Sequence, residues 1–127
     1  MRRPSRAWAG AGAGPLTPVE FHILLSLADG ERHGYAILQD VSQRTDDQLR
    51  LRTGTLYTVI KRMLDSRWIE DTDSPAGDDE RRKYYRLTAL GRLVMKIEAQ
   101  RLQALVTLAQ EKRVLAPARR LASERGK

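Results

Sequence analysis

Basic side chains gather in two short segments of this sequence, and they are the groups whose chemistry is easiest to assign. Residues 50–67 contain five lysines and arginines against one acid, Asp65. Residues 81–86 contain four lysines and arginines and no acid. Lysine and arginine side chains are the usual partners of the phosphate oxygens of nucleic acids. The two segments therefore predict contacts with a phosphate backbone.

The total charge of the chain is a weaker argument than these local clusters. The formal net charge is +7, but residues 1–14 carry three bases and no acid, and residues 113–127 carry five bases and one acid. Residues 15–112 are left with fifteen groups of each sign. We interpret residues 1–14 as a flexible basic arm and residues 116–127 as a basic C-terminal tail, both able to attract phosphate without sequence preference.

Catalysis, metal binding and membrane insertion have little support in the sequence. The chain has no cysteine and only two histidines, His22 and His33, so neither a metal nor a cofactor is expected. No paired carboxylates, nucleophile with a base, or phosphate-binding loop occurs in a plausible context, which argues against an enzyme. No apolar run approaches the roughly 18 residues that span a bilayer, and no signal peptide is recognisable. We expect a cytoplasmic protein with no membrane partner.

Helical spacing of apolar residues predicts three helices in the first half of the chain. The first begins at a Thr17 cap with Pro18 in its first turn and ends at Asp29 and Gly30. The second follows a turn at residues 30–32; there we expect Gly34 to provide backbone freedom and Tyr35 to pack inward. The third spans residues 54–66, is capped by Thr53 or Thr55, and has one apolar face that comprises Leu56, Ile60, Met63 and Leu64.

Two short strands, at residues 68–71 and 84–87, flank a turn-rich segment and predict a β-hairpin. Acidic residues occupy the first strand and the tip of the hairpin, where they would repel phosphate. We therefore expect Arg81, Arg82 and Lys83 to face a nucleic-acid backbone. The tip, residues 77–80, would face solvent or form ion pairs within the chain. Trp68, at the start of the hairpin, is interpreted as a core anchor or, less simply, as a ligand sensor.

A long helix capped by Thr88 is predicted to continue to about Leu115, where Pro117 follows. Its apolar positions spread too widely to be covered by one small core, which favours dimerisation through an antiparallel or crossed helix pair. The expected dimer contacts are Leu90, Leu93, Val94, Ile97, Leu102, Leu105 and Leu108.

This order of elements predicts a mainly α fold with a small β-hairpin. It is that of a winged helix-turn-helix domain at residues 15–87, followed by a dimerisation helix at residues 88–115. The third helix would enter the major groove. Thr55 and Thr58 are the expected base-edge contacts, while Tyr57 either binds a phosphate or simply packs. The expected DNA-binding residues are Arg52, Thr53, Thr55, Tyr57, Thr58, Lys61, Arg62, Arg81, Arg82 and Lys83.

Three short motifs occur together in this chain: His33-Gly34-Tyr35, Gly54-Thr55-Leu56-Tyr57, and residues 82–88 followed by Gly91. In order and spacing they resemble the PadR family of winged-helix transcriptional regulators, over roughly residues 16–112. The resemblance implies dimeric repressors that bind inverted-repeat operators and, in some members, release DNA when a small molecule binds near the dimer helices.

The sequence departs from the family pattern at several positions. Arg52-Thr53 replaces a common Ser-Pro, and Thr58 replaces a frequent proline. The last helix has no aromatic residue, whereas some drug-binding relatives place a tryptophan there. The sequence thus predicts a homodimeric regulator that binds double-stranded DNA, most simply a repressor with a small-molecule effector of unknown identity. The alternative is a winged-helix module that binds another protein and no DNA.

Overall fold

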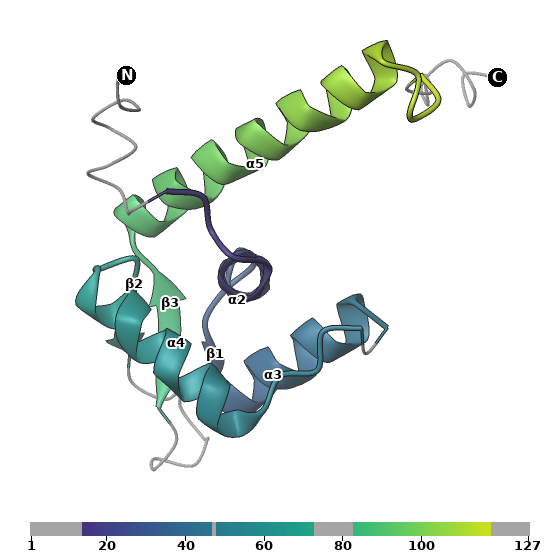
Figure 1. The fold of residues 1–127 in the computed structure, drawn as a ribbon. Coiled ribbons are helices and arrows are strands. Elements are labelled where there is room, and N and C mark those ends of the chain that lie inside the picture. Colours follow the sequence, from purple (N-terminus) through teal and green to yellow (C-terminus); the bar gives the residue numbers. More distant parts are fainter. Residues whose placement is uncertain (1–13, 47, 73–82, 118–127) are drawn as a thin grey trace, which may run out of the picture.

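A computed structural model describes residues 14–46, 48–72 and 83–117 (Figure 1). It contains a small antiparallel sheet in the order β1-β3-β2, helices packed around it, and a long last helix. The elements are α2 (Pro18–Ser26), β1 (Arg32–His33), α3 (Gly34–Arg44), α4 (Thr53–Asp65), β2 (Ile69–Thr72), β3 (Tyr84–Leu87) and α5 (Ala89–Glu111). The predicted winged-helix fold with a long C-terminal helix is confirmed.

The sheet has one strand more than the sequence predicted. No strand was expected at residues 32 and 33, but they form β1, in which Arg32 pairs with Tyr85 and His33 with Tyr84. The predicted pairing of the two later strands is confirmed by β2 and β3, and β1 is a third strand that the sequence did not predict. A strand of two residues is too short to show an alternating pattern, and only its distant partner on β3 identifies it.

Helix α2 begins as predicted. The Thr17 hydroxyl accepts a hydrogen bond from the Glu20 backbone N–H at 3.1 Å, and the Glu20 carboxylate accepts one from the Thr17 N–H at 2.8 Å. The helix ends at Ser26, before the predicted end at Asp29 and Gly30, because the chain passes through a tighter turn first. Gly30 then adopts a positive φ of 154°.

Helix α3 packs on the core through one face, but the prediction for Tyr35 is wrong. Ile37 and Val41 are fully buried, whereas Tyr35, which was expected to pack, is 61% exposed. Two residues along a helix correspond to a rotation of about 200°, so Tyr35 must point away from the core once Ile37 points toward it. The helix is capped by His33, whose Nδ1 accepts a hydrogen bond from the Ala36 N–H at 3.2 Å.

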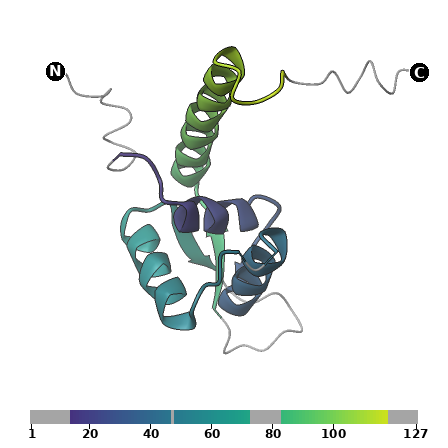
Figure 2. The same cartoon turned by 45° about the vertical axis from the view of Figure 1, so that its right-hand side comes forward.

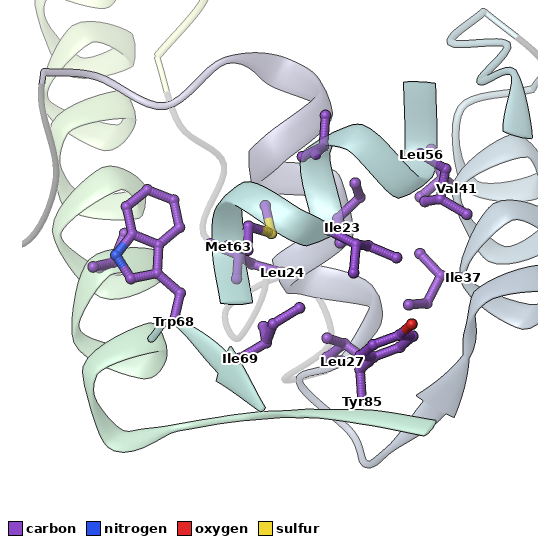
Figure 3. Close-up of a cluster of buried hydrophobic side chains, with 13 residues drawn as sticks. Ile23, Leu24, Leu27, Ile37, Val41, Leu56, Met63, Trp68, Ile69 and Tyr85 are labelled. Carbon is purple, nitrogen blue, oxygen red and sulfur yellow. The ribbon is translucent and has the colours of Figure 1, made fainter. Parts of the chain in front are cut away.

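Helix α4 has the predicted apolar face, since Leu56, Ile60 and Met63 are buried. The predicted cap is wrong. The residue before the helix is Arg52, which makes no side-chain capping hydrogen bond, and Thr53 is already helical. One hydrophobic core joins α2 to α3, α4, β2, β3 and the first part of α5. Trp68 is buried in this core, as the sequence predicted (Figure 3).

Helix α5 begins at the predicted cap, where the Thr88 hydroxyl accepts a hydrogen bond from the Gly91 N–H at 2.9 Å. It ends at Glu111, so the prediction that it continues to Leu115 is wrong. Arg113 adopts a positive φ of 63°, and the Val114 N–H turns back to the Ala109 carbonyl at 2.8 Å. The first half of α5 packs on the domain, and the second half projects away from it (Figure 2). No helix in the described part of the chain is both long and apolar enough to cross a membrane.

Candidate nucleic-acid interface

The polar side of α4 faces solvent over its whole length. Its N-terminal end and the start of β3 lie at one end of the molecule, and α5 lies at the other (Figure 1). Seven of the predicted DNA-binding residues are on or next to this helix and all are exposed: Arg52, Thr53, Thr55, Tyr57, Thr58, Lys61 and Arg62. The structure therefore brings these residues together on one accessible surface, which we call the α4 surface.

The cations of the α4 surface differ in how far they are neutralised. Lys61 pairs with Asp65 at 3.7 Å, and both side chains are highly exposed. Arg62 pairs at 3.1 Å with Glu20, the carboxylate that also completes the α2 cap. The Glu20 side chain is largely buried, so this ion pair holds the Arg62 guanidinium toward α2. The sequence did not predict this contact.

Two arginines, Arg52 of the α4 surface and the neighbouring Arg50, precede the helix and take part in no ion pair among the described residues. Both are exposed. Their charge therefore adds to the partial positive charge at the N-terminus of α4, which favours an anion such as phosphate.

Thr58 has its hydroxyl proton engaged within the helix. Its Oγ1 donates a hydrogen bond to the Gly54 carbonyl at 2.9 Å. The hydroxyl oxygen remains able to accept a hydrogen bond, and the methyl group remains available for apolar contact. The side chain is thus suited to accept a hydrogen bond from a base amino group or to touch a thymine methyl group.

The two acidic residues of β2 form ion pairs with basic residues at β3. Glu70 and Arg86 face each other across β2 and β3 and form an ion pair at 2.7 Å. Hydrogen bonding to Glu70 raises the pKa of the Arg86 guanidinium above its usual value. Asp71 pairs with Lys83 at 3.8 Å. Both acids of β2 are thus paired with cations on or next to β3, while the wing tip, for which solvent exposure or pairing within the chain was predicted, lies outside the described residues. The predicted contacts Arg81 and Arg82 lie outside the described residues.

The segment that contains His33 has a structural role. His33 caps α3 and lies edge-on to Tyr84, with ring centroids 5.3 Å apart. Among the residues that the structure describes, no group of three potential ligands could hold a metal ion. Gly34, expected to provide backbone freedom, does not have a positive φ; that expectation is wrong. Gly34 instead leaves room for the ring of Tyr57.

The predicted dimer residues divide into two groups. Val94 belongs to the core of its own chain, with Leu90 packed against that core, and Ile97 is half-buried. Leu93, Leu102, Leu105 and Leu108 are exposed by 36% to 49%, and Val106, which the sequence reasoning did not include, is 46% exposed. The free apolar surface of α5 therefore lies mainly in its second half.

One buried charge on α5 was missed. Glu98 is only 2% exposed, accepts hydrogen bonds from Arg101 at 2.6 and 3.1 Å, and accepts one from the Leu16 N–H at 3.3 Å. The hydrogen bond with Arg101 holds the pKa of the Glu98 carboxyl below its ordinary value, although burial acts in the opposite direction. The i, i+3 spacing from Arg101 was the only sequence signal for this contact.

The family model for the "Transcriptional regulator PadR-like family" matches residues 23–97 of this chain. That match covers more than half of the sequence and includes α4, the wing strands and the first part of α5. The chain belongs to the PadR-like family. It is therefore a transcriptional regulator and not an enzyme.

Three relatives illustrate the similarity. An "Uncharacterized protein X" of Lysinibacillus sphaericus is 37% identical over 70 residues, which are 55% of this chain and 64% of that relative's length. A PadR family transcription regulator from Clostridium difficile R20291 is 26% identical, with a TM-score of 0.64 over 75% of this chain and 97% of its own. Bacillus subtilis PadR, solved in complex with operator DNA, is 23% identical, with a TM-score of 0.56 over 65% of this chain and 46% of its own.

Proposed function

We propose that this PadR-like regulator is a homodimeric repressor that binds an inverted-repeat operator through α4 and the wing. The observation that carries the proposal is the α4 surface, where Arg50 and Arg52 precede an exposed helix bearing threonines. The structure of Bacillus subtilis PadR with operator DNA supports a DNA-binding role for this fold. The DNA partner also favours a cytoplasmic location.

In this proposal the N-terminal half of α4 enters the major groove. Thr55 and Thr58 contact base edges, while Arg52 and Thr53 bind phosphates at the entry of the helix. Lys61 and Arg62, further along the helix, attract the flanking backbone. The wing contributes Lys83, together with Arg81 and Arg82 at the positions that the sequence analysis assigned to it. Neutralisation of several phosphates makes the affinity depend steeply on salt.

The exposed apolar residues in the second half of α5 form the dimer contact in the proposal. Their position on a projecting helix, remote from the α4 surface, leaves both recognition helices free (Figure 2). A two-fold symmetric dimer presents one recognition helix to each half-site, which is why the operator is expected to be an inverted repeat.

A small-molecule effector would bind beside Trp68. A pocket of about 290 Å³ lies there, and its lining includes Leu16 before α2 and Arg62 and Met63 of α4. A molecule in this pocket would touch both the segment that packs on α5 and the α4 surface. Its binding could therefore change the position of the α4 surface relative to the segment before α2 and to α5.

The test is selection from random duplex DNA with the purified full chain at about 0.15 M salt, near physiological ionic strength. Enrichment of an inverted repeat, with affinity that falls as salt rises, supports the proposal. If folded, dimeric protein enriches no sequence, the proposal fails and the alternative of a protein-binding module is favoured. Repression is then tested with a reporter gene placed downstream of the selected sequence.

A further inference from the structure

The ring of Tyr57 on α4 packs against the first residue of α3. A Cβ atom at Gly34 would lie 2.8 Å from the Tyr57 Cζ, 3.1 Å from its Cε1, and closer still to its hydroxyl oxygen. Gly34 is buried, so a side chain there could not turn toward solvent. Any residue larger than glycine must displace the tyrosine ring or separate the two helices.

The same tyrosine is also close to the wing. Burial raises the pKa of the Tyr85 phenol on β3, and the neighbouring phenol of Tyr57 raises it further. Tyr85 is 4% exposed, and its hydroxyl points toward the side of the core occupied by Ile37 of α3 (Figure 3). β1, which leads directly into α3, pairs with β3 at Arg32 and Tyr85. Tyr57 therefore lies where α3, α4 and the wing strand converge.

We propose that Tyr57 is a positioning residue for DNA recognition, whose ring, seated on Gly34, fixes the N-terminal end of α4 relative to α3 and the wing. The inference rests on the proposed function of α4 as the recognition helix. Thr55 and Thr58 flank Tyr57 on the same helix, so a change in its seating shifts both predicted base contacts.

Base contacts and phosphate contacts respond differently to such a shift. Hydrogen bonds to base edges require accurate placement, whereas the attraction of basic side chains to phosphates tolerates small displacements. Loss of the Tyr57–Gly34 contact is therefore expected to reduce specific binding much more than nonspecific binding. A change that merely unfolded the domain would reduce both equally.

The experiment compares Tyr57→Phe, Tyr57→Ala, Gly34→Ala and the double variant in the full chain. The affinity of each for the selected operator and for a random duplex of equal length is measured at the same salt concentration. The phenylalanine keeps the ring, so operator affinity stays within about threefold of the wild type, a free-energy change below about 0.7 kcal/mol. Tyr57→Ala and Gly34→Ala each lower operator affinity by at least about tenfold, with less than about threefold change for random DNA.

The double variant tests whether the two positions act through one contact. Once the ring is absent, the added methyl group at residue 34 has nothing to displace, so the double variant should bind no worse than Tyr57→Ala alone. Additive losses would overturn the inference. Gly54→Ala is compared with Gly34→Ala in urea unfolding alone, because a Cβ at residue 54 meets no atom within 4 Å but that residue lies on the proposed recognition helix.

Other outcomes separate this inference from the proposed function. If Tyr57→Phe loses as much operator affinity as Tyr57→Ala, the hydroxyl itself binds DNA and the positioning role is wrong. If Gly34→Ala does not fold, the operator affinities of Tyr57→Phe and Tyr57→Ala still show whether the ring or the hydroxyl of Tyr57 is needed. A folded wild-type dimer that binds no DNA overturns the proposed function, and this inference with it.

Discussion

The backbone carbonyl of Trp68 lies directly against Gly91, in the first turn of α5. A Cβ atom at residue 91 would lie 2.9 Å from the Trp68 carbonyl carbon and closer still to its oxygen. The same carbonyl accepts a hydrogen bond from the Thr88 backbone N–H at 3.0 Å. The Thr88 hydroxyl, which donates to the Arg67 carbonyl at 2.6 Å, lies 3.1 Å from the Trp68 carbonyl oxygen. The start of α5 is thus fixed to the junction between α4 and the wing.

Gly91→Ala is expected to destabilise the protein, because the obstructing atoms belong to backbone that cannot rotate away. Overpacking of this kind costs about 1–3 kcal/mol of unfolding free energy. The measurement is urea unfolding at fixed protein concentration, with Gly54→Ala as control. At that open helical site alanine should leave stability unchanged or raise it by up to about 1 kcal/mol. Equal stability of the two variants would mean that α5 is not seated as described.

Glu98→Gln is expected to weaken the attachment of the segment before α2 to α5. The change keeps the shape of the side chain but removes the charge that the Arg101 guanidinium and the Leu16 N–H contact. Loss of a charge-assisted hydrogen bond at a buried site costs about 1–3 kcal/mol. Glu111→Gln, which changes an exposed acid at the end of the same helix, should change stability by less than about 0.5 kcal/mol.

The same carboxylate predicts a pH dependence. In the folded chain the pKa of Glu98 is below its ordinary value of 4.5, so the unfolded chain binds the proton more readily. The stabilisation is therefore fully present above about 4.5 and is lost as the pH falls through the lower folded value. The difference in unfolding free energy between wild type and Glu98→Gln should shrink on acidification below that point. A difference that stays constant down to pH 3, about one unit below the ordinary range of carboxyl groups, would contradict the assignment.

The parts of the fold that the sequence predicted are those specified locally. The Thr17 and Thr88 caps and the apolar face of α4 follow from residues a few positions apart, and β2 and β3 follow from two short runs separated by one turn-rich segment. The missed features depend on partners far along the chain. β1 exists because Tyr84 and Tyr85 lie beside it, and Gly34 is needed because of a tyrosine 23 positions later. No local pattern distinguishes that glycine from one in a turn.

The candidate site also has features that local sequence predicted and features that depend on residues far along the chain. The exposed side of α4 was predictable from helical periodicity, and all seven residues assigned to it are on the surface. The sequence could not show which cations are neutralised, since Glu20, the partner of Arg62, is 42 positions away. It also could not show that Val94 belongs to its own core rather than to a dimer contact. Both depend on tertiary packing.

The Lys61–Asp65 pair predicts opposite effects of two neighbouring substitutions on DNA binding. Lys61→Ala removes a cation from the α4 surface and should weaken operator binding by more than about 1 kcal/mol while reducing the salt slope by about one. Asp65→Asn removes the anion 3.7 Å from Lys61 and should strengthen binding. Both are measured by fluorescence anisotropy across a salt series. If Lys61→Ala binds normally at every salt concentration, Lys61 lies outside the interface.

Leu105→Glu is expected to produce monomers, because it places a charge in the centre of the apolar surface that we assign to the dimer. Leu105 is 49% exposed in the single chain, so the change leaves the core intact, and circular dichroism should be nearly unchanged. Burying an unpaired carboxylate against a second copy would be strongly unfavourable. Gln103→Glu introduces the same charge on an exposed polar position of the same helix and should remain dimeric. Sedimentation of both variants over a range of concentrations distinguishes the outcomes. A Leu105→Glu chain that stays dimeric would place the interface elsewhere and remove the geometric basis for an inverted-repeat operator.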